Sequence, residues 1–149
     1  MSKLDIINNF VSLEKIALAG ISANEKKFGN SILKTLASKG YEMYPIHPTI
    51  EDKYGYQCYK DVSSLPHDVK GLIICVRPEA AEELIPKALN KGIKYIWLQN
   101  GSESLKSLKY CEENGINVVS KECIMMFAAP QGFHGFHRWI WKTLRLLPN

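Results

Sequence analysis

The sequence predicts an α/β protein with a Rossmann-like, doubly wound and mostly parallel sheet. Strand-like and helix-like segments alternate along the chain, and the strand-like runs are apolar throughout, as in sheets that helices cover on both faces. A length of 149 residues fits a single domain. We expect the domain to span residues 1–126 and a helical tail, rich in aromatic and basic residues, to follow over 127–149.

The first part of the chain contains two predicted helices and two predicted strands. The run K-I-A-L-A-G over residues 15–20 is typical of a buried strand that enters a turn at its glycine. Ile32, Leu33 and Leu36 lie on one helical face, and Gly40 stops that helix. The expected order is helix 6–13, strand 15–20, helix 29–39 and strand 41–46.

The second part continues the alternation. The run G-L-I-I-C-V over 71–76 is the most apolar in the chain and predicts a central strand. Pro78 suits a first helical position, whereas Pro86 should kink or loosen the same helix. Ser102 is expected to cap the next helix. The expected order is a loop over 47–70 with a short strand near 57–59, strand 71–76, helix 78–91, strand 95–98, helix 102–113 and strand 116–119.

Charge and composition exclude several classes of protein. The formal net charge is +4, but residues 132–149 hold three basic residues and no acid, so 16 basic and 15 acidic residues leave only +1 elsewhere. This excess is too small to imply nucleic-acid binding. No apolar run reaches about 18 residues and no secretory pattern opens the chain, so we expect no transmembrane segment and a cytoplasmic protein with reduced thiols.

The first strand-to-helix turn carries the features of a phosphate site. Ligands of such sheets bind beyond the carboxyl ends of the strands. Here a tight glycine turn, a hydroxyl, two lysines and the N–H groups of a helix start come together, at Gly20, Ser22, Lys26, Lys27, Gly29 and Asn30. The spacing does not match G-x-G-x-x-G, and an ordinary strand-to-helix turn remains the alternative.

Other strand ends add candidate contacts. No acid follows the second strand before Glu51, which argues against the ribose contact of an NAD site, while Pro45 and Pro48 form a stiff wall that a purine could pack on. Arg77 can hold a phosphate with two parallel hydrogen bonds, or it is a solvated surface charge. The later strand ends offer Gln99, Gly101 and Cys123.

Catalytic motifs are missing from these strand ends. The sequence holds no H-E-x-x-H or Walker motif, and its spacing supports neither a Ser–His–Asp set nor paired carboxylates. The residues therefore favour a binder of a phosphate-bearing nucleotide over an enzyme. An NAD(P)-binding, oxidoreductase-like domain stays open on the predicted fold alone.

Five segments together resemble the CoA-binding domain family, found in succinyl-CoA synthetase α subunits and acyl-CoA synthetases. They lie between residue 15 and about residue 126, and their order and spacing are more specific than any one of them. The segments are A-L-A-G-I-S-A-N-E-K-K-F-G-N (17–30), Y-E-M-Y-P-I-H-P (41–48), I-I-C-V-R-P-E (73–79), I-W-L-Q-N-G (96–101) and N-V-V-S-K-E-C-I-M (117–125).

The resemblance implies that the ligand is coenzyme A or an acyl-CoA. The family more often has V-N-P where this chain has I-H-P, so His47 replaces an asparagine. A further ligase domain with a phosphorylated histidine has no counterpart here, so ligase chemistry is not implied. The implied contacts are Gly20, Ser22, Lys27, Gly29 and Asn30 with the phosphates; Pro45, His47 and Pro48 with the adenine–ribose end; Val76, Arg77 and Pro78 along the pyrophosphate and pantetheine; Gln99 and Gly101 near the pantetheine arm; and Cys123 near the thiol.

The C-terminal tail leaves two interpretations open. Phe136, Trp139 and Leu144 are among the apolar residues on one side of a predicted helix, with Arg138 and Lys142 mostly opposite. Such a helix could dock on a membrane surface or a scaffold partner. We favour the alternative, in which it packs on its own domain or across a homodimer.

Overall fold

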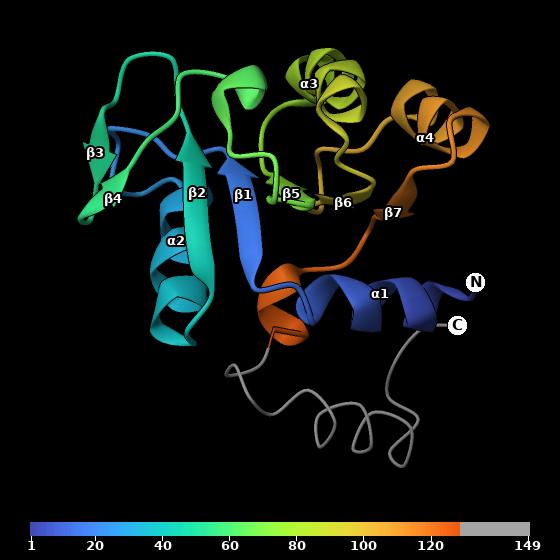
Figure 1. Ribbon diagram of the computed structural model, residues 1–149, viewed down its shortest axis with the longest axis horizontal. Coiled ribbons are helices and arrows are strands. Elements are labelled where there is room, and N and C mark those ends of the chain that lie inside the picture. The colour runs from blue at the N-terminus through green and yellow to red at the C-terminus, as the bar shows by residue number, and fades with distance from the viewer. Residues whose placement is uncertain (129–149) are drawn as a thin grey trace.

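A computed structural model describes residues 1–128 of the chain. Five strands form one parallel sheet, which confirms the predicted fold class (Figure 1). The strands lie in the order β2 (Glu42–Ile46), β1 (Lys15–Ala19), β5 (Gly71–Ile74), β6 (Tyr95–Leu98) and β7 (Asn117–Val119). The chain therefore moves outward from β1 to β2 and then returns to β5, which creates a switch point between β1 and β5.

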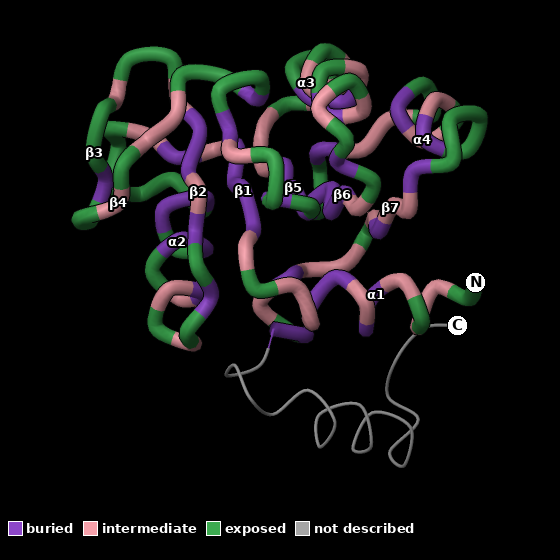
Figure 2. The backbone as a smooth tube through the Cα atoms, viewed as in Figure 1, coloured by how far each residue is buried: buried purple, intermediate pink, exposed green. Residues whose placement is uncertain are grey.

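Helices cover both faces of the sheet. Side chains alternate along β1, so that Ile16 and Leu18 enter one core while Ala17 and Ala19 enter the other. Figure 2 shows that the central strands are buried. The helices α1 (Lys3–Val11) and α2 (Phe28–Ser38) pack on the first face, and α3 (Pro78–Lys91) and α4 (Leu105–Glu113) pack on the second.

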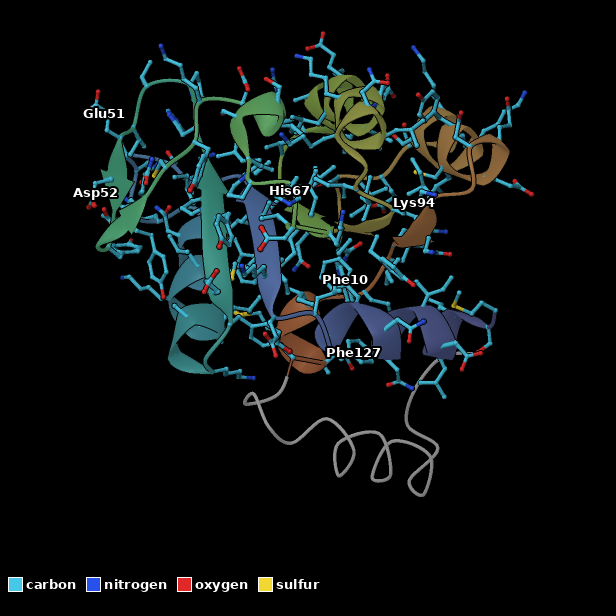
Figure 3. All side chains as sticks on the ribbon, viewed as in Figure 1. Phe10, Glu51, Asp52, His67, Lys94 and Phe127 are labelled. Carbon is cyan, nitrogen blue, oxygen red and sulfur yellow. The ribbon has the colours of Figure 1, made fainter. Side chains whose placement is uncertain are left out.

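An aromatic cluster closes the α1 face of the sheet. The ring of Trp97 on β6 is fully buried, with the Phe10 ring centroid at 5.4 Å and the Phe127 ring centroid at 5.8 Å. Figure 3 labels Phe10 and Phe127. Phe127 directly follows the 3-10 helix η2 (Ile124–Met126). The C-terminal end of the described chain is thus packed into the core. The tail predicted over 127–149 thus begins with two residues, Phe127 and Ala128, that are buried in the core. Its residues 129–149, and with them both interpretations of the tail helix, lie outside the described residues.

The segment between β2 and β5 is more structured than the predicted loop. It contains the antiparallel pair β3 (Asp52–Lys53) and β4 (Tyr56–Gln57), followed by the 3-10 helix η1 (Val62–Ser64). Tyr59 forms an isolated parallel bridge with Ile46, because its N–H donates to Pro45 O and its carbonyl accepts from His47 N, both at 2.8 Å. This bridge brings the chain after Tyr59 to the carboxyl end of β2.

The predicted N-cap of α4 is wrong. Ser102 does not cap α4; the cap is Ser104, whose Oγ accepts from Ser107 N at 3.0 Å. Ser102 is buried instead, and its Oγ donates to Val76 O at 2.6 Å and accepts from Val76 N at 3.1 Å. The helix α3 continues through Pro86 from Pro78 to Lys91, so the proline does not end it.

Candidate functional site

Two adjoining hollows open at the carboxyl edge of the sheet, beside the switch point between β1 and β5. They share Gly20, Ile21 and Val76. The first, of about 460 Å³, we call the loop hollow; it is lined by Gly20, Ile21, Ser22, Lys27, Cys75, Val76, Arg77 and Ala80. The second, of about 400 Å³, we call the β2 hollow; it is lined by Ala19, Gly20, Ile21, Ile46, His47, Pro48, Lys60, Asp61, Val62, Val76, Leu84 and Lys87.

Two glycines allow the first strand and helix to meet at the loop hollow. Gly20 has φ +135°, and a Cβ there would lie 2.4 Å from Cys75 O. A Cβ on Gly29 would lie 2.1 Å from Gly20 O. Any side chain at either position would therefore push α2 or β5 away from the end of β1. The close approach fixes where the N-terminus of α2 points.

Side-chain hydrogen bonds hold the loop between β1 and α2 in one shape. Asn30 is buried, accepts from Ser22 N at 3.0 Å, and donates to Ser22 O at 2.9 Å and to Asn24 O at 3.0 Å. At the outer side, Glu25 binds Lys53 Nζ at 2.7 Å and the hydroxyl of Tyr54 on the β3–β4 hairpin. These two partners, Lys53 first, hold the pKa of the Glu25 carboxyl below its usual value. Asn30 thus positions the loop, and both N–H donors of its side chain are used in doing so.

The loop hollow receives the N-termini of two helices. Lys27 is the N-cap of α2 and Arg77 is the N-cap of α3, and neither side chain bonds the first turn of its helix. Backbone N–H groups of an uncapped helix start attract anions, and both N-cap residues add a full positive charge at the same place. Pro78 occupies the first position of α3, where the absent N–H is not needed. Two positive side chains and two helix starts thus border one hollow, an arrangement that attracts anions.

His47 shapes the rim of the β2 hollow. Its Nδ1 accepts from Thr49 N at 3.1 Å and from Ile50 N at 3.0 Å, so a neutral ring carries its proton on Nε2. An asparagine at this position would close the same kind of turn with its side-chain oxygen. Pro48 lines the hollow beside it, whereas Pro45 is buried in the edge strand β2, where a missing N–H is tolerated.

Seven of the predicted contact residues line neither hollow, namely Gly29, Asn30, Pro45, Pro78, Gln99, Gly101 and Cys123. Gln99 is buried; its Nε2 donates to Cys123 Sγ and its Oε1 accepts from Ile124 N, both at 3.0 Å. Gln99 therefore fixes the segment after β7 to the sheet. Gly101 is exposed, and its N–H donates to Glu103. Cys75 lines the loop hollow instead, and burial, with a smaller effect of Cys123, raises the pKa of its thiol.

Sequence reasoning missed two lysines of the β2 hollow, Lys60 and Lys87. Lys60 reaches the hollow through the bridge at Tyr59, which joins residues 13 positions apart in the chain (59 − 46) and leaves no local signal. The position of Lys87 could have been predicted from helical periodicity, because Ala80, Leu84 and Lys87 follow a spacing of four and three on α3 and so share one face.

Within residues 1–128, no cluster of acidic, His and Cys side chains could hold a metal ion.

Comparisons with known proteins give the class of this chain. Residues 14–129 match the family model described as a CoA binding domain, and the chain belongs to that family. It is 27% identical over 121 residues to an ADP-forming acetate–CoA ligase of Archaeoglobus fulgidus, covering 74% of this chain and 18% of the ligase. It is 30% identical over 86 residues to such a ligase of Methanocaldococcus jannaschii, covering 57% of this chain and 12% of the ligase. The chain thus spans less than a fifth of these relatives.

A smaller relative matches along almost its whole length. The solved structure of a conserved hypothetical protein from Pyrococcus furiosus is 38% identical, with a TM-score of 0.74, and the match covers 76% of this chain and 98% of that chain. This likeness agrees with the observed sheet and helices.

Among the helices within residues 1–128, none combines the length and the hydrophobicity that a membrane span requires.

Proposed function

We propose that this protein binds coenzyme A or an acyl-CoA at the two hollows and performs no ligase chemistry of its own. The observation that carries the proposal is the loop hollow, where Lys27, Arg77 and two uncapped helix starts surround one space. Membership of the CoA-binding family supports the same ligand. The diphosphate of CoA would lie there, its adenosine would enter the β2 hollow, and its pantetheine would extend toward Cys75 and Val76.

Removing the two cations tests this proposal. Calorimetry with the full chain should give binding of CoA and acetyl-CoA and much weaker binding of NAD. The Lys27→Ala/Arg77→Ala variant should bind CoA about tenfold to a hundredfold more weakly, since a hydrogen bond to a charged group contributes roughly 1.5–3 kcal/mol. Its affinity should also depend less on salt concentration.

A matched variant removes the same charge elsewhere. Lys70→Ala/Lys94→Ala also deletes two exposed cations, but these precede β5 and β6 at the opposite edge of the sheet and line neither hollow. Its CoA affinity should stay within about twofold of the parent. Equal losses in both double variants would place the ligand elsewhere, and binding of NAD without CoA would overturn the proposal.

A turnover assay separates a binding protein from a ligase. The name of the two archaeal relatives describes formation of an acyl-CoA with release of ADP. Incubating the chain with acetyl-CoA, ADP and phosphate should release no free CoA thiol above the rate without protein. A protein-dependent release of thiol together with ATP would show ligase activity and contradict the non-catalytic part of the proposal.

A further inference from the structure

The loop between β1 and α2 is bound from outside by the β3–β4 hairpin (Figure 1). Lys53 Nζ lies 2.7 Å from Glu25 Oε1, and the hydroxyl of Tyr54 donates to Glu25 Oε2. Two consecutive residues of the hairpin therefore bind both oxygens of one loop carboxylate. In the sequence, Glu25 stands between Ser22 and Lys27, which both line the loop hollow.

Lys53 is a buried cation with one anionic partner in residues 1–128. Its side chain is 9% exposed, whereas that of Glu25 is 62% exposed, and no other salt bridge in this range includes Lys53. A buried ammonium group is unfavourable unless an opposite charge reaches it. Lys53 therefore favours the loop position in which Glu25 contacts the hairpin.

Tyr54 adopts a backbone conformation that a tyrosine disfavours. Tyr54 and Gly55 form the two-residue turn of the hairpin, with φ +53° and φ +84°. Positive φ at both positions is typical of a type I′ turn, for which asparagine followed by glycine is preferred. A tyrosine there strains the backbone. Its hydroxyl bond to Glu25 is a contact that an asparagine would not make.

The ring of Tyr54 also connects the hairpin to α2. Lys34 Nζ, from α2, lies 4.6 Å from the ring centroid, and Lys53 Nζ lies 4.9 Å from it. Cations at these distances are attracted to an aromatic ring. Tyr54 thus contacts the loop through its hydroxyl and the following helix through its ring.

We propose that Lys53 and Tyr54 are positioning residues, which clamp Glu25 and so hold the β1–α2 loop in the shape that binds phosphate groups. This proposal rests on the proposed function and adds how the loop is kept ready for its ligand. A loop that already has its binding shape loses less conformational entropy when an anion binds. The alternative is that Glu25 acts only through its negative charge, which opposes an anion nearby.

A double-mutant cycle in the full chain separates the clamp from a charge effect. Glu25→Ala, Lys53→Met and the double variant are each titrated with CoA by calorimetry. All three should bind CoA about threefold to fivefold more weakly than the parent, the factor that an ion pair with one exposed partner can contribute. The losses should not add, because each variant breaks the same clamp. Methionine keeps the apolar stem of Lys53, so Lys53→Met should fold.

A matched control removes an acid of the same region. Glu51 is exposed and directly precedes β3, and Glu51→Ala should change CoA affinity by less than about 1.5-fold. An increase of CoA affinity in Glu25→Ala would mean that this residue acts only through its charge, and would overturn the clamp. Unchanged affinity in the three variants of the cycle would also overturn it and leave the proposed function standing.

Tyr54→Asn gives effects of opposite direction on stability and binding. Asparagine suits the turn, so the urea midpoint of unfolding should stay equal or rise. CoA affinity should fall about twofold to fivefold, because the bond to Glu25 is lost. A lower midpoint together with unchanged CoA affinity would make Tyr54 a purely structural residue and contradict its positioning role.

Hydrogen exchange of the ligand-free protein tests the clamp without CoA. Three loop N–H groups form bonds inside the loop: Asn24 N to Ser22 Oγ at 3.0 Å, Lys26 N to Asn24 Oδ1 at 3.1 Å and Lys27 N to Asn24 O at 3.0 Å. They should exchange about threefold to fivefold faster in Glu25→Ala, while the amides of β5 keep their rates. Unchanged loop exchange would overturn the clamp alone. No CoA binding by the parent would overturn the proposed function and the positioning role together.

Discussion

At the scale of single residues, His47 shows how one side chain can preserve the geometry of a turn. Its Nδ1 accepts two backbone N–H groups, from Thr49 and Ile50. An asparagine, which the sequence resemblance makes the more frequent residue here, can close a similar turn with its side-chain oxygen. The imidazole therefore accepts hydrogen bonds from the backbone of its own turn. These two bonds hold the ring beside the β2 hollow.

This role gives a prediction that separates two substitutions. His47→Asn should keep the turn and change CoA affinity by less than about threefold, while His47→Ala should lower the free energy of unfolding by about 1 kcal/mol, because backbone donors lose their acceptor. Urea unfolding and calorimetry measure the two effects. If His47→Asn is as unstable as His47→Ala, the acceptor role is wrong.

At the residue scale, the sequence could predict the positions of side chains whose signal is local. Lys27 and Arg77 each stand between a strand and a helix start, so the topology of a parallel sheet brings them to one edge. Lys60 could not be placed, since the bridge of Tyr59 to Ile46 depends on how residues 47–70 fold back. Nor does the sequence show that the backbone N–H of Ser22 donates to Asn30 Oδ1 rather than to a ligand.

At the scale of elements, the junction of β1 and α2 depends on backbone contact. The helix start at Gly29 lies against the carbonyl of Gly20, and Lys27, the N-cap of α2, lines the loop hollow. The sequence predicted both elements, because their apolar spacing is strong. It misplaced the cap of α4, because Ser102 and Ser104 are equally good caps and only burial decides between them.

We predict that Gly29→Ala weakens both stability and binding. Its Cβ would lie 2.1 Å from backbone, which cannot yield as a flexible side chain does, so α2 must shift. The free energy of unfolding should fall by about 1–3 kcal/mol, and CoA affinity should fall as well. Ser31→Ala, at an exposed position of the same helix, is the control and should leave both unchanged. Unchanged CoA affinity in a folded Gly29→Ala variant would show that the N-terminus of α2 does not contact the ligand.

At the scale of the whole molecule, charge is distributed unevenly along the chain. The net charge is +4, yet residues 132–149 carry +3 of it. The rest of the chain is nearly neutral, so the proposed anion binding would depend on local placement of cations such as Lys27 and Arg77, which line the loop hollow. Bulk attraction of an anion by a net charge of +1 would be small and quickly screened by salt.

This distribution predicts that the tail is dispensable for binding. Both hollows and the aromatic cluster that ends at Phe127 are formed within residues 1–128. A chain ending at Ala128 should therefore fold and bind CoA within about twofold of the full chain, with the same dependence on salt, because the cations that meet the ligand are all retained. Calorimetry at two salt concentrations measures both quantities. The truncated chain could lose much more than twofold in affinity and still unfold cooperatively. Residues 129–149 would then contribute to the site. A loss seen only at low salt would assign that contribution to Arg138, Lys142 and Arg145.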